Sequence, residues 1–588
     1  MHRLPALIAS LAVISFSTPA AAAVYRVGSG PGCTHASIQT AIGAAAVTTA
    51  DDEIRLSATL AYSQQALLVD QVQGVLVLAG GYASCSDAVP LAGARTVIDG
   101  DGNSPVLRIN ATRTVALQRL DIQGGGTAGR GGGIYATGGD GAVLALSNTL
   151  VRGNQAYAGG GIAVLNSDAN ADPASMQLLL FGDSAVTSNS AVAGGGVQCI
   201  GATVHLFDST HVSLNTATDY GGGIYALDCR LEIGSRGIGG AVLWANSAGG
   251  DGGGLYLYGA RGDADIYTID ASMPARILGN SAARGGAIAL ARDAHLRLSE
   301  TNLEDNTASV AGGAVLVEAA TDASGDTRFT MQGSTDGAPA AAVRCADPES
   351  CNRMRGNRAI DGGFRKPGAA IVVASPVAHA AHAMFRGTRI DDSFGESLVR
   401  HGGDYGQVAF NGALIVDNNV GGALLDAPGA ANSLVLTATT ITYNAIGPGR
   451  GVIAGAGGCD PEDDVRGTYA QLDIVWQPEN ALIEPTSALR SGCFQYLVAN
   501  DFGSLPPAAE RVVADPLFRD AAAGDYRLSL GSIAVDFAPA TAQTATRDGG
   551  PRVFDFTNLQ DRFGPQDLGA YEFAPDLIFA DGFEPVGN

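Results

Sequence analysis

The feature that most constrains the fold of this chain is a short motif that recurs at least seven times between residues 150 and 360. Each copy has an apolar residue, two spacers, an Asn, any residue and an Ala, followed by a glycine-rich element. The seven Asn residues are Asn154, Asn189, Asn215, Asn246, Asn280, Asn306 and Asn357. Units this short cannot bury their apolar sides alone and must stack on their neighbours, so the motif predicts a solenoid.

The length of each unit can be measured between the residues that end successive glycine-rich elements. They are Ile134, Ile162, Val197, Ile224, Leu255, Ile288, Val315 and Phe364. From Ile134 to Val315 the intervals range from 27 to 35 residues, and alternating runs such as 142–146 and 176–181 between them are typical of strands. A constant motif with variable spacing predicts loops inserted between strands on the surface.

Each conserved position of the motif has an expected structural role. The apolar residue three before each Asn and the residue after the glycines are expected to point into a narrow core. The Asn is expected at a bend, where it tolerates left-handed geometry, and its carboxamide should bond to the copies above and below. The sequence therefore predicts an all-β parallel β-helix for most of the chain.

The paired elements resemble the GGA(I/L/V) and FxxN repeats of the polymorphic outer-membrane proteins, within the pectin-lyase-like right-handed β-helix class. The resemblance covers residues 130 to 365, with weaker copies at Asn418 and Asn444. It implies a right-handed parallel β-helix. The aromatic of FxxN is replaced here by Val, Leu, Ile or Met, so the resemblance supports the fold more than the function.

The chain is predicted to have five parts. Residues 1–23 have the layout of a secretory signal peptide, with Arg3, an apolar stretch and an alanine run before Val24. Residues 24–95 are expected to form an N-terminal cap and the first coils, with a short helix over 37–46. Residues 96–480 form the β-helix, and residues 481–575 form a closing segment with a little β structure. Residues 576–588 are a tail.

The closing segment resembles the choice-of-anchor Q segment found after β-helices of bacterial surface and secreted proteins. The resemblance rests on four ordered motifs, at 515–518, 524–528, 531–536 and 567–572. Together with the signal peptide, it implies export from a Gram-negative bacterium, as a secreted or surface-associated protein. After signal removal no stretch is apolar and long enough to be a membrane-spanning helix.

The charge and composition of the chain limit the classes of partner that can be expected. The net charge is −23, and Lys366 is the only lysine, so nucleic acid is not an expected partner. A monomer is expected. The eight cysteines of an exported chain predict disulfides, and pairing in sequence order gives Cys33–Cys85, Cys199–Cys229, Cys345–Cys351 and Cys459–Cys493. These cysteines are expected to form structural disulfides and not to bind a metal.

Catalytic signatures are sparse. Of the polygalacturonase-like motifs only the Asp pair Asp391–Asp392 occurs, and neighbouring side chains on one strand face opposite ways. His401 and Asp404 could supply a base beside a carboxylate. No cofactor is predicted, and Ca²⁺ is the weaker alternative. The start of a calcium loop at Asp99 lacks the later ligands and favours a solvated turn.

Two functions remain open from the sequence. The first is a non-enzymatic, adhesin-like protein whose faces bind polysaccharide or another cell-surface ligand. The alternative is a divergent polysaccharide lyase or glycoside hydrolase that uses carboxylates around residues 391 to 404. An acidic cleft with clustered Asp, Arg and His would favour the enzyme.

Overall fold

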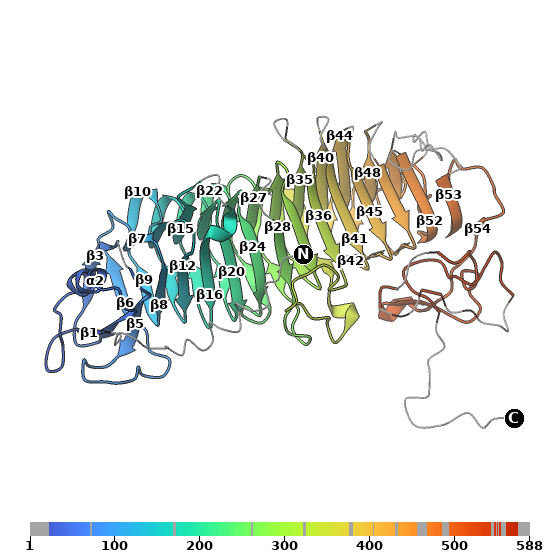
Figure 1. The fold of residues 1–588 in the computed structure, drawn as a ribbon. Coiled ribbons are helices and arrows are strands. Elements are labelled where there is room, and N and C mark those ends of the chain that lie inside the picture. Colours follow the sequence, from blue (N-terminus) through green and yellow to red (C-terminus); the bar gives the residue numbers. More distant parts are fainter. Residues whose placement is uncertain are drawn as a thin grey trace, which may run out of the picture.

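The protein is an elongated, right-handed parallel β-helix, whose coils stack along one axis (Figure 1). The computed structural model describes residues 23–573 except 71–72, 169–171, 260–262, 321–324, 376–379, 404, 430–432, 456–466, 485–492, 542–545, 549, 551, 554 and 556–559. Within that part of the chain, no helix has the length and hydrophobicity to cross a membrane. The predicted signal peptide, apart from its last residue, and the tail at 576–588 lie outside the described residues.

Each regular coil has four short strands, which contribute to three parallel sheets. Sheet B has one strand per coil. Its members are β4 (Leu67–Val69), β7 (Leu107–Ala111), β11 (Ile134–Gly138), β15 (Ile162–Asn166), β19 (Val197–Ile200), β23 (Ile224–Leu227), β27 (Leu255–Tyr258), β31 (Ile288–Ala291), β35 (Val315–Glu318), β40 (Ile371–Ser375), β44 (Val399–Gly403), β48 (Leu425–Ala427) and β51 (Ile453–Gly455).

Sheet A receives two strands from each coil. The first series is β1 (Val24–Val27), β2 (Asp52–Ser57), β5 (Leu76–Tyr82), β8 (Thr114–Gln118), β12 (Ala142–Ser147), β16 (Met176–Phe181), β20 (Thr203–Asp208), β24 (Arg230–Ser235), β28 (Asp263–Tyr267), β32 (His295–Ser299), β36 (Thr327–Gln332), β41 (Ala381–Arg386), β45 (Gln407–Asn411) and β49 (Ser433–Thr437). The second is β3 (Tyr62–Gln65), β6 (Thr96–Gly100), β9 (Leu120–Gln123), β13 (Leu150–Arg152), β17 (Ala185–Thr187), β21 (His211–Ser213), β25 (Ala241–Trp244), β29 (Arg276–Leu278), β33 (Asn302–Glu304), β37 (Arg353–Arg355), β42 (Arg389–Asp391), β46 (Leu414–Val416) and β50 (Thr440–Thr442).

Sheet C and the last strands of sheet A complete the stack. Sheet C contains β10 (Gly126–Arg130), β14 (Gln155–Ala158), β18 (Ser190–Ala193), β22 (Thr216–Tyr220), β26 (Ser247–Ala248), β30 (Ser281–Arg284), β34 (Thr307–Ala311), β38 (Arg358–Asp361), β43 (Phe394–Gly395) and β47 (Asn419–Val420), with β39 (Phe364–Arg365) at its side. The long β52 (Gly467–Trp476) pairs with both series of sheet A, and β53 (Phe494–Ala499) and β54 (Arg511–Val513) follow it.

The core is a continuous apolar column inside the coils. The apolar residue three before each Asn is buried, as predicted; Val151, Val186 and Val212 are each 0% exposed. The residues after the glycines are buried too, from Ile134 through Val315. Parallel pairing in register places like residues above one another, so the column continues from coil to coil.

The prediction for Phe364 is wrong. Its side chain is 76% exposed, and Ile371 takes the core position, in register with Val315. The reason is local: Gly362 and Gly363 both have positive φ and turn the chain into a short antiparallel hairpin between β38 and β39. Such two-residue turns favour glycine, so the same Gly-Gly pair that elsewhere precedes a core strand here makes a surface hairpin.

The Asn residues form the predicted ladder. From Asn154 to Asn306, each Nδ2 donates to Oδ1 of the next Asn at 3.0–3.1 Å, and the backbone N–H of the same residue donates to that oxygen as well. The ladder resumes between Asn418 and Asn444 at 2.9 Å. Left-handed geometry occurs at this bend, but positive φ falls on the residue before the Asn, as at Gly153, Ser188 and Leu214. That residue makes the bend and leaves the Asn free to align its carboxamide along the stack.

The N-terminal cap is a single helix, α2 (Ile38–Ala46), capped by Ser37. Its buried residues, Ile38, Ala41, Ile42 and Ala45, form the predicted apolar face.

The disulfides Cys33–Cys85, Cys199–Cys229 and Cys345–Cys351 are confirmed. Cys493 is also disulfide-bonded, but its predicted partner Cys459 lies outside the described residues.

The closing segment folds back along the outside of the last coils, on the same side as the insertion that precedes β37 (Figure 1). It contains a small antiparallel pair, β55 (Phe518–Asp520) and β56 (Asp525–Leu528). Leu414 and Val416 point outward from β46 and are nevertheless 0% exposed, because Tyr526, Ala570 and Tyr571 cover them. The segment therefore buries an apolar outer surface that other coils lack.

Candidate functional site

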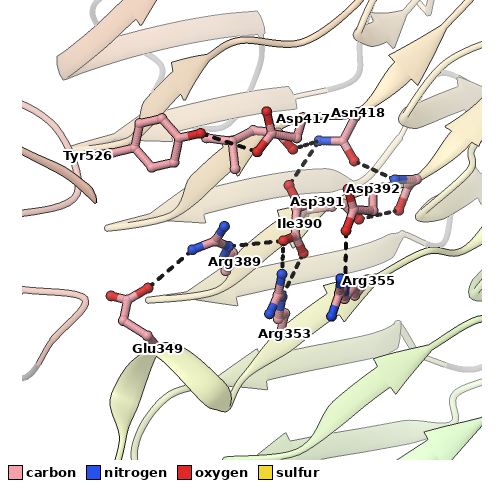
Figure 2. Close-up of polar contacts among 12 residues, drawn as sticks. Glu349, Arg353, Arg355, Arg389, Ile390, Asp391, Asp392, Asp417, Asn418 and Tyr526 are labelled. Atoms are coloured by element: carbon pink, nitrogen blue, oxygen red, sulfur yellow. Dashed lines mark hydrogen bonds and ion pairs between the residues drawn. The ribbon is translucent and has the colours of Figure 1, made fainter. Parts of the chain in front are cut away.

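The predicted Asp pair lies on the outer face of sheet A, where β37, β42 and β46 run side by side (Figure 2). Asp391, at the end of β42, is only 1% exposed. Its carboxylate accepts hydrogen bonds from Nε of Arg353 at 2.8 Å and Nε of Arg389 at 3.1 Å, and pairs with a second Arg353 nitrogen. Both oxygens are thereby held by arginines, so Asp391 is part of an ion-pair network.

Glu349 connects this network to the closing segment. Its carboxylate lies 3.5 Å from Nη1 of Arg389 and 3.4 Å from Nη2 of Arg547, and it accepts a hydrogen bond from the Tyr571 hydroxyl at 2.8 Å. Burial raises the pKa of Glu349, but Arg547, Tyr571 and Arg389 outweigh it, and the pKa lies below its ordinary value. The ionised carboxylate thus joins three segments that are far apart in the sequence.

Asp392 is separate from this network. It is the positive-φ residue of its coil, at φ 53°, so its side chain leaves the sheet in a different direction from that of Asp391. Its carboxylate is 47% exposed and pairs with Nε of Arg355 at 2.9 Å (Figure 2). The two carboxylates therefore do not face a common space in which a substrate could be held between an acid and a base.

The next coil repeats this arrangement with a different partner. Asp417, again the positive-φ residue, accepts a hydrogen bond from the hydroxyl of Tyr526 at 3.2 Å (Figure 2). Burial raises the pKa of Asp417 above its ordinary value, and burial likewise raises that of Tyr526. This contact fixes the closing segment to the outer face of the stack.

His401 lies in the core. It occupies an inward position of β44, in register with Val373, and is 0% exposed. Burial lowers its pKa to about 4, so the ring is neutral at physiological pH. Asp391 lies on the outer face of another sheet, so the structure does not bring these two residues together. Asp404 lies outside the described residues.

A group of buried ionisable residues where the closing segment packs against β52 was not predicted. Asp473 and Asp567 are each 0% exposed, and Arg552 is 2% exposed. Burial raises the pKa of Asp473 well above its ordinary value and that of Asp567 to about 7. Asp567 accepts the backbone N–H groups of Asp536, at 2.8 Å, and of Phe573. Asp567 belongs to the motif at 567–572, which the sequence linked only to the closing segment.

Two further features could bind a ligand. Asp536, Asp555 and Asp561 each place a carboxylate oxygen within 4.8 Å of the others, a donor set of the kind that Ca²⁺ accepts. Near the N-terminus, a mainly apolar cleft of about 490 Å³ lies between the segments 58–63 and 81–99. The nearby segment from Asp99, for which the sequence favours a solvated turn over a calcium loop, contains a turn, since Asp101 accepts the N–H groups of Asn103 and Ser104 at 2.8 Å.

The outer face of sheet B is more regular. From β15 to β40 two rows of side chains point outward in unbroken register. The first row is Ala163, Gln198, Tyr225, Tyr256, Ala289, Leu316 and Val372, and the second is Leu165, Ile200, Leu227, Tyr258, Ala291, Glu318 and Ala374. Glu318 is the charged member of these rows.

Four tyrosines gather here, and we call them the tyrosine face: Tyr225, Tyr256 and Tyr258 from sheet B, and Tyr220 from the end of β22 in sheet C. The ring centre of Tyr256 lies 5.0 Å from that of Tyr220, 5.6 Å from that of Tyr225 and 6.2 Å from that of Tyr258. Strand alternation after the glycines places Tyr225, Tyr256 and Tyr258 outward, which the sequence could have indicated. Their proximity follows from the stacking of coils.

Comparison with known proteins adds no assignment: no family model matches the chain, and no curated protein matches it.

Proposed function

We propose that this chain is an exported, non-enzymatic β-helix protein that binds glycans or cell surfaces. The proposal rests on the observation that Asp391 and His401, the candidates for acid–base catalysis, have structural roles in the fold. Asp391 is held between two arginines, and His401 belongs to the apolar core. A general acid or base must reach a substrate proton, and neither side chain is placed to do so. What supports binding is the long, regular outer surface.

We infer export from the signal-peptide layout of residues 1–23 and from the disulfides, which persist in oxidising compartments. The repeat and closing motifs support kinship with the pectin-lyase-like class, the polymorphic outer-membrane protein repeats and choice-of-anchor Q segments. The proposed location is the medium or outer surface of a Gram-negative bacterium, where the protein acts as a monomer. N-terminal sequencing of the exported chain should begin at Val24, and recovery of uncleaved chain in the cytoplasm would contradict the location.

The test of function uses the mature chain, residues 24–588. It is incubated with neutral polysaccharides and with uronic-acid polymers, with and without Ca²⁺, while retention on immobilised glycan and release of reducing or unsaturated products are measured. Binding without product is the expected result. Turnover that is lost in an Asp391→Asn or His401→Gln variant, with folding retained, would establish the lyase or hydrolase instead.

A further inference from the structure

We propose that the tyrosine face on the outside of sheet B is a binding site for a neutral, linear polysaccharide that lies along the axis of the stack. This inference rests on the proposed function and specifies its site and ligand class. The ligand is chosen by the shape, the chemistry and the charge of this face.

The tyrosines supply the chemistry that a sugar requires. A tyrosine has an apolar ring, on which the C–H face of a pyranose can pack, and a hydroxyl tip that bonds with sugar hydroxyls. Tyr220 is 41% exposed, and Tyr225 and Tyr258 are partly exposed beside it. Burial raises the pKa of Tyr225 and of Tyr256, so both hydroxyls stay protonated and can donate.

The regular register of the face fits a polymer. Sheet B pairs without a register shift from β15 to β40, so equivalent outward positions recur at each coil, roughly 4.8 Å apart. Outside the tyrosines the first row is buried, so a polymer would meet the partly exposed side chains of the second row and the tyrosines. A linear pyranose chain that lies along the axis of the stack crosses successive coils, so its sugars can meet equivalent positions. The aliphatic residues Leu165, Ile200 and Leu227 extend the apolar strip from the tyrosines toward the N-terminal coils.

The charges around the face favour a neutral ligand over an anionic one. Arg284 is paired with Asp251 at 2.7 Å and with Glu318 at 3.3 Å, and the guanidinium of Arg292 lies 5.4 Å from the ring centre of Tyr258. Arg284 is thus matched by carboxylates and Arg292 is placed against an aromatic ring, in a chain of net charge −23. Arg130 is a further, exposed cation that acts on Tyr225. A polyuronate would be repelled, whereas carboxylates can accept hydrogen bonds from neutral sugar hydroxyls.

The double variant Tyr220→Ala/Tyr258→Ala tests the site in the mature chain. Tyr443→Ala is the matched control, since Tyr443 is 49% exposed at a bend that follows β50 in sheet A, outside the tyrosine face. Affinity electrophoresis is run with a mixed-linkage β-glucan, xyloglucan, dextran and polygalacturonate. Thermal unfolding checks that each variant is folded, and Tyr220→Phe separates the ring from the hydroxyl.

We expect wild type and Tyr443→Ala to bind at least one neutral glucan alike, the double variant to bind at least tenfold more weakly, and polygalacturonate not to bind. Equal binding by the double variant and wild type would overturn the site while leaving the proposed function intact. Preference for polygalacturonate would overturn the ligand class. Binding to no glycan would remove both proposals, and a concentration-dependent dimer that the double variant abolishes would make the face an interface between copies.

Discussion

The coils that contain Asn154 to Asn357 and the coil that contains Ser393 stabilise the same bend with different hydrogen bonds. In the first region each bend has a buried Asn, whose amide bonds to identical neighbours. In the second, Ser393 takes the Asn position, as the pairing of Arg358 with Phe394 shows, and the side-chain ladder stops for one coil. Its backbone N–H still donates to Asn418, at 3.1 Å.

The outer face changes at the same place. Beside the interruption, Asp391, Arg353, Arg389 and Glu349 form the ion-pair network, and Arg547 of the closing segment contacts it. The regular coils gain stability from short-range repetition, whereas this region depends on residues from three distant segments. The Asp pair that resembles a catalytic motif therefore lies where the Asn ladder is interrupted and an ion-pair network stabilises the stack.

The largest expected effect comes from breaking the ladder in its regular region. Asn246 is 0% exposed, donates to Val212 and Asn280, and accepts from Asn215. Asn246→Leu removes all of these bonds and leaves buried partners unsatisfied, so the free energy of unfolding should fall by about 4 kcal/mol. Chemical denaturation measures it. Asn110→Leu, on an exposed residue, is the control, and equal effects of the two would mean that the ladder contributes no special stability.

The network beside the interruption is tested by removing one charge. Asp391→Ala leaves Arg353 and Arg389 without their shared carboxylate, and breaking such a buried pair should lower the free energy of unfolding by about 3 kcal/mol. Asp392→Ala removes a half-exposed carboxylate and should cost less than about 1 kcal/mol. Similar costs for the two variants would contradict the distinction between them.

The closing segment should respond to pH through Asp567. Its pKa is raised to about 7 in the folded protein, above its ordinary value of 3.8. The folded state therefore keeps a proton that the unfolded chain has lost between these values, and the stability contributed by Asp567 falls as pH rises from about 4 to about 7. The difference in unfolding free energy between wild type and Asp567→Asn should shift by about 2 kcal/mol toward the variant between pH 5 and pH 8.

Other groups also change the stability in this range, including His401, whose pKa is lowered to about 4 only in the folded protein. The measured quantity is therefore the difference between the two proteins at each pH. A difference that does not change with pH would mean that Asp567 is ionised in the folded state. Tyr571 lies four residues after Asp567 in the sequence. A spectroscopic signal from Tyr571 would therefore link the change to the closing segment.

The smallest effect is a gain. Ser393→Asn would place a carboxamide between Asn357 and Asn418, where Asn418 already receives the backbone N–H of Ser393. A continuous ladder should raise the free energy of unfolding by about 1 kcal/mol. A loss would show that the turn beside Asp391 differs too much from the regular bends to hold an Asn.

Much of the fold followed from local sequence patterns. The core positions, the Asn ladder and the capping helix were predictable because each depends on a repeating unit or a short amphipathic pattern. Three disulfides followed from pairing the cysteines in sequence order. Phe364 failed because a Gly-Gly pair serves equally in a hairpin and before a core strand. Of the site candidates, Asp391 and His401 looked available for chemistry because a sequence does not show which side chains its distant parts cover.

By itself, the sequence determined that the chain stacks in coils, since a motif that is constant while the loops between its copies vary offers the same bonds and the same apolar face to each neighbour. Only the tertiary structure decided that the closing segment covers β46, that Glu349 meets Arg547 across almost two hundred residues, and that four tyrosines share one outer face. These contacts depend on how many residues each loop inserts and on where the chain folds back, and neither is encoded in the motif.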